Sequence, residues 1–476
     1  MIEELKEELK KLKARLDVLE KENIELRTEN TKFKDEIKRL SAENTKLKER
    51  LNKNSSNSDK PPSTDDFKRR QRNIKKSKRK RGAQPGHKGI TRKKVATENI
   101  TKHIKFHIED ICSCGCKEVV AKQMKPKHQT WELPKIVPNI TQYYVESGRC
   151  KNCKKRRTAK FPLEVPKGAL GPKTQSIISM LTGQYRVSRR NAKKILAELC
   201  GLDISVGTVS NSEKIVSNAL RNPCMEILKK ARASSIINVD ETGHFHWAKR
   251  CYSWILATPN LTVMKTGLKR NRKALKALLG KNFEGTIISD NYNVYNYLSR
   301  DKHQLCWAHL HRKFKAFSEK PGFLGIIGKT LLKLSRRVFY TYKQLKLGYI
   351  VYDDYWSLLL QLRNEFRYLF GKYYRKVPDI QSLAYLYWLE GERVWQFAQN
   401  PEIEPTNNLA ERDLRPSVIW RKTSFGTWSY RGDRFCERML TFVGTLRKQS
   451  RNVLDCLIET VEAKQYGLLA PSVFPD

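Results

Sequence analysis

The stretch S-S-I-I-N-V-D-E-T-G, residues 234–243, decides the fold of the larger part of the chain. Its short apolar run, IINV, ends at Asp240 beside residues that favour a turn. The stretch EGTIISDNYNVY, residues 284–295, repeats the pattern, and its apolar run leads to Asp290. Between them, CYSWILATP and TVMKTG are typical of strands, and KALKALLG is typical of a helix. The pattern predicts an α/β domain in which two strands end on aspartates.

Asp240 and Asp290 are therefore candidate catalytic residues, because ligands gather at the carboxyl ends of strands in open α/β sheets. Each could instead be an ordinary loop cap. A third carboxylate, Glu411, occurs in NNLAERDLRP, where Asn408 as N-cap and Glu411 three residues later approach a capping box. Two aspartates and a glutamate also match the needs of two-metal phosphoryl transfer, in which carboxylate oxygens hold two Mg²⁺ ions. The local cap and the catalytic role are compatible.

Composition excludes several classes of protein. The chain has 476 residues, and 94 lysines and arginines against 49 acidic residues give a net charge of +45. Self-repulsion of this size indicates a polyanionic partner, with nucleic acid favoured over an anionic membrane surface. No apolar run approaches the roughly 20 residues of a membrane span, and the charged N-terminus predicts no signal peptide. The eleven cysteines then favour reduced thiols and metal binding in a cytoplasmic protein.

Residues 1–52 have the heptad repeat of a coiled coil. One seam position is apolar at every seventh residue from Leu5 to Leu47, and the other runs from Ile2 to Leu51 with three asparagines. Asparagine at a seam position favours a two-stranded, parallel pairing. A single amphipathic helix docked on the body is the alternative. We expect the chain to be at least a dimer.

Residues 53–100 form a polar and then strongly basic linker. Between residues 66 and 94, lysine and arginine outnumber acids fourteen to one. Such a block cannot fold alone, and it would neutralise phosphates without reading bases. A solubilising tail is the alternative.

Two cysteine clusters mark residues 101–165 as a small zinc-binding module. The second cluster, Cys150 and Cys153, is a C-x2-C knuckle, whereas the first offers three thiols, Cys112, Cys114 and Cys116. Two of the three with the second pair would make a tetrahedral Zn²⁺ site. Reduced structural thiols are the alternative.

Residues 166–230 are predicted to form a helix-turn-helix. A helix stops at Gly201, and a further helix opens at Ser205 that could enter a major groove. Generic packing of three helices explains the pattern almost as well.

Taken in order, VDETG, SDNYNVY, CWAHLHRKF and NNLAERDLRP resemble the transposases of the bacterial insertion sequence 66 family. The linker's SSNSDKPPS and GAQPGHKG and the two cysteine clusters extend the resemblance over essentially the whole chain. It implies an RNase H-like catalytic core with a DDE triad. Asp240, Asp290 and Glu411 would be the ligands of Mg²⁺ or Mn²⁺. The implied multidomain organisation places the core at 231–313 and 401–450, a helical insertion at 314–400, and a C-terminal helix and tail at 451–476.

Further residues join the candidate site. Cys306 and His309 in CWAH resemble a motif of the family that lies near the catalytic strands, and a core cysteine with a structural histidine is the alternative. His309 could also contact a phosphate. Four basic residues near Glu411 are candidate contacts for DNA phosphates, unless they form a merely solvated face: Arg412, Arg415, Arg421 and Lys422.

The expected function is that of a DNA transposase that cuts the ends of its element and joins them to target DNA. The partners would be the element's terminal repeats, target DNA and a second copy of the chain, with accessory proteins of the element also possible, in the bacterial nucleoid. Two alternatives are a non-catalytic DNA-binding regulator derived from a transposase and an RNase H-like nuclease that cuts without joining.

Overall fold

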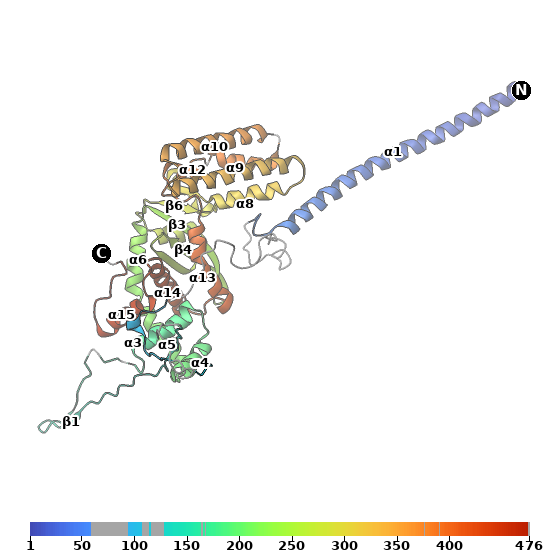
Figure 1. Ribbon diagram of the computed structural model, residues 1–476. Coiled ribbons are helices and arrows are strands. Elements are labelled where there is room, and N and C mark those ends of the chain that lie inside the picture. Colours follow the sequence, from blue (N-terminus) through green and yellow to red (C-terminus); the bar gives the residue numbers. More distant parts are fainter. Residues whose placement is uncertain are drawn as a thin grey trace. The chain divides into compact units, whose positions relative to one another are not determined.

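The computed structural model (Figure 1) divides into two compact units, residues 1–69 with 216–476, and residues 70–215. Most of the predicted basic linker, together with Cys112 and Cys116, lies outside the described residues. The structure describes residues 1–58, 94–106, 114–115, 128–162, 165–166, 168–375, 377–389 and 391–474.

A mixed five-stranded sheet with the order β5-β4-β3-β6-β7 forms the centre of the first unit. Strand β3 pairs antiparallel with β4, and β4 with β5, whereas β3, β6 and β7 run parallel. The predicted strands are all present, because their apolar runs suit a sheet that is covered on both faces. The bounds are β3 (Ile236–His246), β4 (Lys249–Ala257), β5 (Thr262–Leu268), β6 (Thr286–Ser289) and β7 (His303–Leu305).

Strand β3 is longer than its apolar run. The prediction that a strand ends on Asp240 is wrong, since β3 continues to His246. Its first three residues pair with β6, and its remainder forms a hairpin with β4. The polar half of β3 is extended because it pairs with β4. Asp240 lies just beyond the residues of β3 that pair with β6, at the point where these two parallel strands separate. Asp290, in contrast, does follow the last residue of β6.

Two helices from the C-terminal part of the chain pack on the antiparallel half of the sheet. Helix α13 packs on β3 and β4, and α14 packs on β5. Ala410 and Leu414 of α13 share a buried cluster with Ile255 of β4 and Met264 of β5. The helices around the sheet are α6 (Arg221–Arg232), α7 (Arg272–Leu279), α13 (Asn408–Ser424), α14 (Tyr430–Lys448) and α15 (Val453–Tyr466), with 3-10 turns at Asn293–Tyr295 and Arg300–Lys302.

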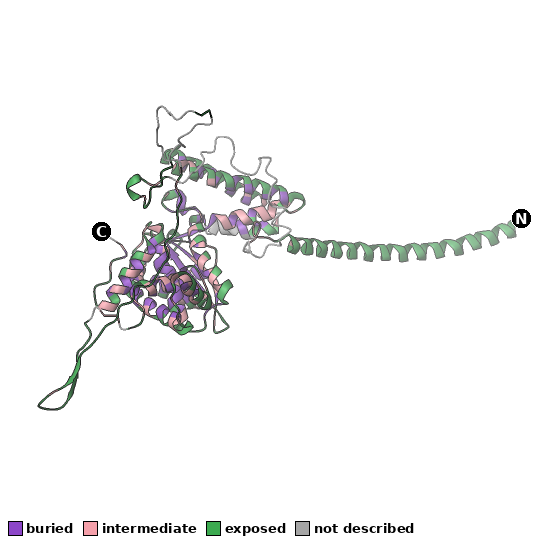
Figure 2. Cartoon of the chain, turned by 60° about the horizontal axis from the view of Figure 1, so that its bottom comes forward, coloured by how far each residue is buried: buried purple, intermediate pink, exposed green. Residues whose placement is uncertain are grey.

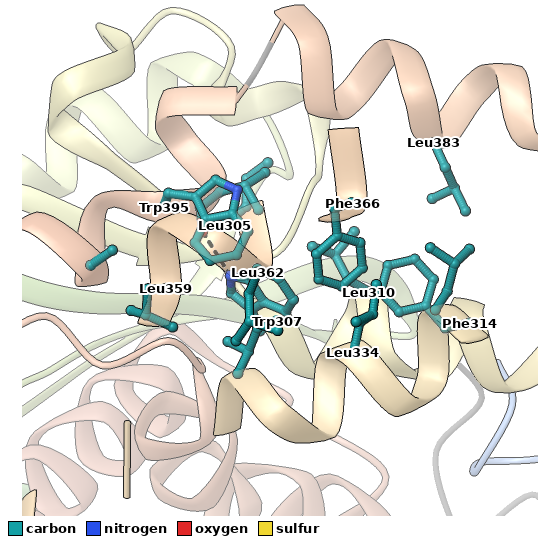
Figure 3. Close-up of a cluster of buried hydrophobic side chains, with 14 of the residues drawn as sticks. Leu305, Trp307, Leu310, Phe314, Leu334, Leu359, Leu362, Phe366, Leu383 and Trp395 are labelled. Atoms are coloured by element: carbon teal, nitrogen blue, oxygen red, sulfur yellow. Dashed lines mark hydrogen bonds between the residues drawn. The ribbon is translucent and has the colours of Figure 1, made fainter. Parts of the chain in front are cut away.

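Five helices separate β7 from α13 and form a helical module with its own core. Trp307 is fully buried there and packs edge-on against Phe366 and Trp395 (Figure 3). Leu305 of β7 belongs to the same cluster, which attaches the module to the sheet. The helices are α8 (Trp307–Ser318), α9 (Gly322–Lys346), α10 (Tyr352–Tyr373), α11 (Pro378–Leu389) and α12 (Gly391–Gln399).

The second unit contains a small helical core and a hairpin. Ile178, Leu196 and Val209 come from three successive helices and are buried together. One helix ends at Gly201, which has the left-handed conformation that glycine adopts without strain. The elements are α3 (Pro172–Ser179), a π-helix (Met180–Gln184), α4 (Arg189–Cys200), α5 (Val206–Ala219, which continues into the first unit), a 3-10 turn (Thr97–Asn99), and the strands β1 (Ser147–Arg149) and β2 (Arg156–Thr158).

The predicted N-terminal helix is present as α1 (Ile2–Asn52). No residue of α1 is buried, so its apolar seam is open to solvent along its whole length (Figure 2). Within the described part of the chain, no helix combines the length and the apolar character needed to cross a membrane.

Candidate active site

The register of the sheet places Asp240 beside Asp290. Asn238 of β3 is paired with Ile288 of β6, and each aspartate lies two residues further along its parallel chain segment. Neighbouring strands are about 5 Å apart, and residues two apart point to the same face. The two carboxyl groups therefore emerge next to each other, where β3 turns away to pair with β4. The backbone N–H of Tyr292 donates to Asp290 Oδ1 (3.1 Å) and fixes that side chain.

Glu411 comes to the same place on the first turn of α13. The predicted cap is wrong in its position, because the N-cap residue is Asn407 and Asn408 lies within the helix. The Asn407 side chain does not cap the helix but reaches the sheet. Its Nδ2 donates to the carbonyl of Val239 (2.8 Å), and its Oδ1 accepts from Asn238 Nδ2 (3.0 Å). These contacts attach the start of α13 to the strand that carries Asp240.

The three carboxylates influence one another electrostatically. Burial raises the pKa of Asp240 well above its usual range, and the negative charges of Glu241, Asp290 and Glu411 raise it further. Like charges that lie close together disfavour ionisation, so this shift records their proximity. A cation between the carboxylates would relieve that repulsion.

Sequence reasoning missed a second buried acid, Glu241, and its partners. Arg270, in the loop after β5, forms an ion pair with Glu241 Oε1 (2.6 Å), and the Tyr295 hydroxyl donates to Oε2 (3.0 Å). The Arg270 guanidinium also lies 3.7 Å from the ring centroid of Tyr292. Glu241 directly follows Asp240 in VDETG, which was the available signal, whereas Arg270 belongs to no motif. Arg270 and Tyr292 border an open pocket of about 370 Å³ that Asn271, Arg272 and Asn293 also line.

Cys306 and His309 lie next to Glu411. Across the residues that the structure describes, these three form the one set of potential ligands whose donor atoms all lie within 4.8 Å of each other. The Asp240, Asp290 and Glu411 oxygens are spaced more widely than that set. Cys306 is buried, its Sγ accepts from the backbone N–H of Asn407 (3.1 Å), and burial raises the pKa of its thiol to about 11. Cys306 is thus a core residue that also supports the start of α13.

The basic residues of α13 differ in their surroundings. Arg412, Arg415 and Lys422 are exposed on the helix. Arg421 is half-buried and donates to the carbonyl of Gly243 and to Thr242 Oγ1 (3.4 Å). Arg421 therefore links the far end of α13 to β3, and the other three are open to an outside partner.

The cysteines of the second unit are described only in part. Cys114 and Cys153 are exposed, and Cys150 is half-buried in the turn between β1 and β2. Backbone N–H groups of Cys153 and Asn152 donate toward the Cys150 thiol and lower its pKa. Amides directed at a thiolate also suit a metal-bound sulfur. The structure does not bring Cys114 and the Cys150–Cys153 pair into one set of closely spaced ligands among the described residues.

A mixed sheet with neighbouring carboxylates, in a chain of net charge +45, suits an enzyme that processes nucleic acid. Comparison with family models makes the assignment specific, since the model described as Transposase IS66 family matches residues 170–434. The chain belongs to this family, which confirms the resemblance seen in the motifs. A second model, a family of unknown function (DUF6444), matches residues 2–93. No curated protein matches the chain significantly.

Proposed function

We propose that this chain cuts the ends of a mobile element and joins them to target DNA, with Asp240, Asp290 and Glu411 as the ligands of divalent cations. The observation that carries the proposal is geometric: the pairing of Asn238 with Ile288 places Asp240 beside Asp290, and the Asn407 side chain attaches the first turn of α13, which bears Glu411, to β3. These residues come from β3, from the loop after β6 and from α13, so only the folded chain unites them. The strand order, with three antiparallel and two further parallel strands, supports an RNase H-like core.

The donor set fits Mg²⁺ or Mn²⁺. Hard divalent cations prefer carboxylate oxygens, and the mutual repulsion of these acids favours a positive charge between them. When bound, such cations activate the attacking oxygen and stabilise the charge on the leaving oxygen.

Residues of the protein hold the catalytic acids in place. Asn407 and Cys306 hold the start of α13 against the sheet and so fix Glu411. Arg270 forms an ion pair with Glu241, so Asp240, Asp290 and Glu411 would be the acids that hold the cations. In the proposed reaction, water attacks the phosphodiester at the element end and frees a 3′-hydroxyl. That hydroxyl then attacks a target phosphodiester, and a target 3′-hydroxyl leaves, without a covalent enzyme intermediate.

Basic residues beside the acids would hold the DNA backbone. Arg412, Arg415 and Lys422 lie on the same helix as Glu411 and are exposed, as phosphate contacts require. We assign His309 the role of orienting Glu411 or contacting a phosphate, since its ring lies beside that carboxylate.

The remaining parts of the chain would locate and pair the element ends. Zn²⁺ held by Cys150, Cys153 and two of the first three cysteines would stabilise the hairpin module. The helix α5, whose first two residues Val206 and Gly207 are exposed, would enter a major groove. The open seam of α1 would pair two copies of the chain, so that both ends are held in one nucleoid complex.

The decisive experiment is strand cleavage of labelled DNA that carries the element's terminal repeats, with Mg²⁺. The native chain is compared with Glu411→Gln and with the control Glu402→Gln, which changes an exposed glutamate of the preceding loop. We expect the native chain and the control to cut and join. Glu411→Gln should bind the same DNA and lose cleavage by at least about a hundredfold, the scale of a lost electrostatic catalytic contact.

Other outcomes favour other functions. If the native chain binds these ends and never cuts them, a DNA-binding regulator becomes the better assignment. If it cuts but never joins, the chain acts as a nuclease. Equal cutting by Glu411→Gln would remove Glu411 from the catalytic site.

A further inference from the structure

Four large aromatic side chains are exposed together near the C-terminal end of β3. Trp247, Phe425, Trp428 and Tyr430, which we call the aromatic platform, have 62%, 79%, 67% and 76% of their surface exposed. They come from the β3–β4 turn and from the loop between α13 and α14. The two segments are joined, because the Trp247 N–H donates to the carbonyl of Thr427 (3.0 Å) and its indole N–H to the carbonyl of Trp428.

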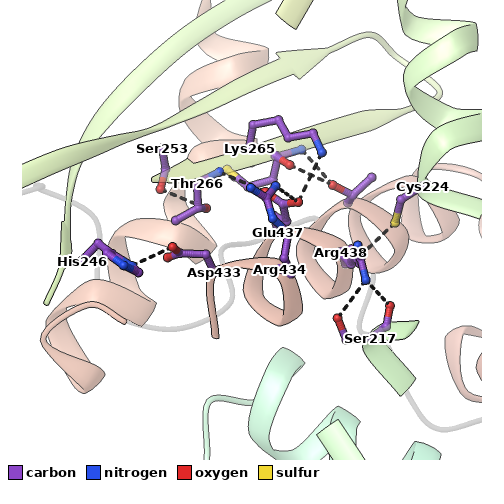
Figure 4. A network of polar contacts seen from close by, with 12 residues as sticks. Ser217, Cys224, His246, Ser253, Lys265, Thr266, Asp433, Arg434, Glu437 and Arg438 are labelled. Carbon is purple, nitrogen blue, oxygen red and sulfur yellow. Dashed lines mark hydrogen bonds and ion pairs between the residues drawn. The ribbon is translucent and has the colours of Figure 1, made fainter. Parts of the chain in front are cut away.

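A contact between His246 and the buried Asp433 lies next to the aromatic platform, and Figure 4 shows these two side chains directed at each other. Asp433 is only 2% exposed, and its Oδ2 lies 2.7 Å from His246 Nδ1. Asp433 also accepts a hydrogen bond from the Thr427 hydroxyl. The His246 ring in turn lies 4.7 Å from the ring of Tyr430 and stacks parallel to Trp247. The platform is therefore a fixed surface on a buried base rather than a pair of loose loops.

Packing of the core does not explain these aromatic residues. Trp247 and Phe425 both have the left-handed backbone conformation, with φ of 50° and 56°. Side chains other than glycine, asparagine and aspartate rarely adopt it. The left-handed backbone belongs to the two-residue turn between β3 and β4 at Trp247 and to the C-cap of α13 at Phe425. The rings themselves lie in solvent and gain nothing from burial, so their exposure together indicates contact with a ligand.

The charge around the platform identifies the kind of ligand. Residues 245–250 and 422–431 contain no acidic side chain, and their cations are Lys249, Arg250, Lys422 and Arg431. A surface that combines exposed aromatic rings with cations alone is suited to single-stranded nucleic acid, in which phosphates meet the cations and free base faces meet the rings. Duplex DNA offers the phosphates but keeps its base faces stacked internally.

The position of the platform relative to the acids is fixed by two independent elements. His246 is six residues beyond Asp240 on β3, which corresponds to about 20 Å at the rise of a strand. Phe425 is fourteen residues beyond Glu411 on α13, which corresponds to about 21 Å at the rise of a helix. Both elements run the same way, since His246 forms a parallel bridge with Thr427. At the duplex rise of about 3.4 Å per nucleotide, about 20 Å corresponds to roughly six nucleotides, and an extended unpaired strand spans it with fewer.

We propose that the aromatic platform stacks against unpaired bases of the DNA, within about six nucleotides of the phosphate that is cut. This inference rests on the proposed function, which identifies the DNA as an element end. It adds that bases near the cut are unpaired while the protein holds this DNA. Trp428 is the residue whose role is easiest to isolate, because only its backbone carbonyl is used in the contact with Trp247.

The test compares binding of the full chain to two fluorescent probes without added Mg²⁺. The probes are an oligothymidylate of about 20 nucleotides and a duplex of equal length, since stacking tolerates any base sequence. Trp428→Ala should weaken binding of the oligothymidylate about fivefold or more, and binding of the duplex less than about twofold, given the energy of one base–aromatic stack. Trp428→Phe should keep most of the affinity.

A matched control separates this effect from a general loss of exposed aromatic surface. Tyr349, at the end of α9, is 71% exposed, and Tyr349→Ala should bind both probes as the native chain does. Unchanged binding of the oligothymidylate by Trp428→Ala, or an equal loss for both probes, would overturn the platform and favour a protein partner or a general electrostatic surface. Because these readouts need no cleavage, a native chain that binds as expected but never cuts contradicts the proposed function alone.

Discussion

At the scale of single residues, Asn407 links the helix of Glu411 to the strand of Asp240. Its side chain is buried and makes two hydrogen bonds to β3, while its backbone N–H reaches Cys306. Removal of a buried amide leaves partners that water cannot reach. The geometry of the acids thus depends on a residue that bears no charge.

Asn407→Ala tests that dependence. The variant should lose about 1–3 kcal/mol of the free energy of unfolding, the cost of leaving buried polar groups unpaired, as measured by urea titration. It should also lower cleavage, because α13 is no longer attached beside Asp240. The neighbouring Asn408 is exposed, so Asn408→Ala should stay within about 0.5 kcal/mol of native. Equal losses for the two variants would contradict the assignment.

The raised pKa of Asp240 makes stability depend on pH. Between the ordinary value of 3.8 and the raised value, the folded chain binds more protons at this site than the unfolded chain. Stability contributed by Asp240 therefore falls as pH rises through that range. A divalent cation that compensates the charges should raise the melting temperature more at about pH 8 than at about pH 5.

Asp240→Asn provides the control for this pH effect. The variant lacks the charge, so without divalent cations it should melt higher than the native chain at neutral pH and respond little to Mn²⁺. If Mn²⁺ raises the melting temperature of both proteins equally at both pH values, the cation does not bind between these acids.

At the scale of elements, the helical module depends on Trp307. This residue opens α8, packs against Phe366 and Trp395, and donates its indole N–H to the carbonyl of Val394 (2.7 Å). Trp307→Ala should destabilise the module by about 3–5 kcal/mol, as large truncations in a core do. It should also disturb His309, which lies two residues further along α8.

An exposed aromatic residue of the same module is the reference for Trp307→Ala. Tyr368 of α10 is exposed, and Tyr368→Ala should change the free energy of unfolding by less than about 0.5 kcal/mol. Urea unfolding, followed by tryptophan fluorescence, distinguishes the two variants. Similar small effects for both would mean that the module is not organised around this cluster.

The sequence predicts the elements well where the signal is local. The apolar runs of β3 and β6, the stop at Gly201 and the long α1 follow from residues that lie next to each other. The second half of β3 was missed because polar residues become a strand there only by pairing with β4. The cap at Asn408 was misplaced for the same reason, since the contact of Asn407 with Asn238 spans 169 residues.

The candidate site also contains residues that local motifs reveal and residues that only the folded chain reveals. Asp240, Asp290 and Glu411 could be selected because each stands in a motif, and in the structure Asp290 and Glu411 lie close enough to raise the pKa of Asp240. Arg270 could not be selected, because its importance comes from the buried Glu241 that it neutralises. The aromatic platform could not be seen either, since exposure of its rings is a property of the folded chain.

At the scale of the whole molecule, α1 is a helix with an uncovered seam. Its leucines at every seventh position are exposed, and a long apolar stripe in water favours pairing with a second copy. We expect the native chain to have the mass of a dimer in light scattering after size exclusion.

Paired substitutions test the role of this seam. Leu12→Lys with Leu19→Lys places charges in the seam and should shift the chain toward the monomer. Ala14→Lys with Thr28→Lys adds the same residue on the outer face of α1 and should leave the dimer intact. A monomeric native chain, or the same mass for both pairs, would contradict the predicted coiled coil.

The most direct test of the central claim is the joining step on its own. A DNA end that carries the terminal repeat and a free 3′-hydroxyl is incubated with target DNA, Mg²⁺ and either the native chain, Asp290→Asn or Asp301→Asn. Asp301 is an exposed aspartate eleven residues after Asp290. The native chain and Asp301→Asn should insert the end into target DNA, and Asp290→Asn should bind it without joining. Joining by Asp290→Asn at the native rate would contradict the assignment of these carboxylates as the catalytic site.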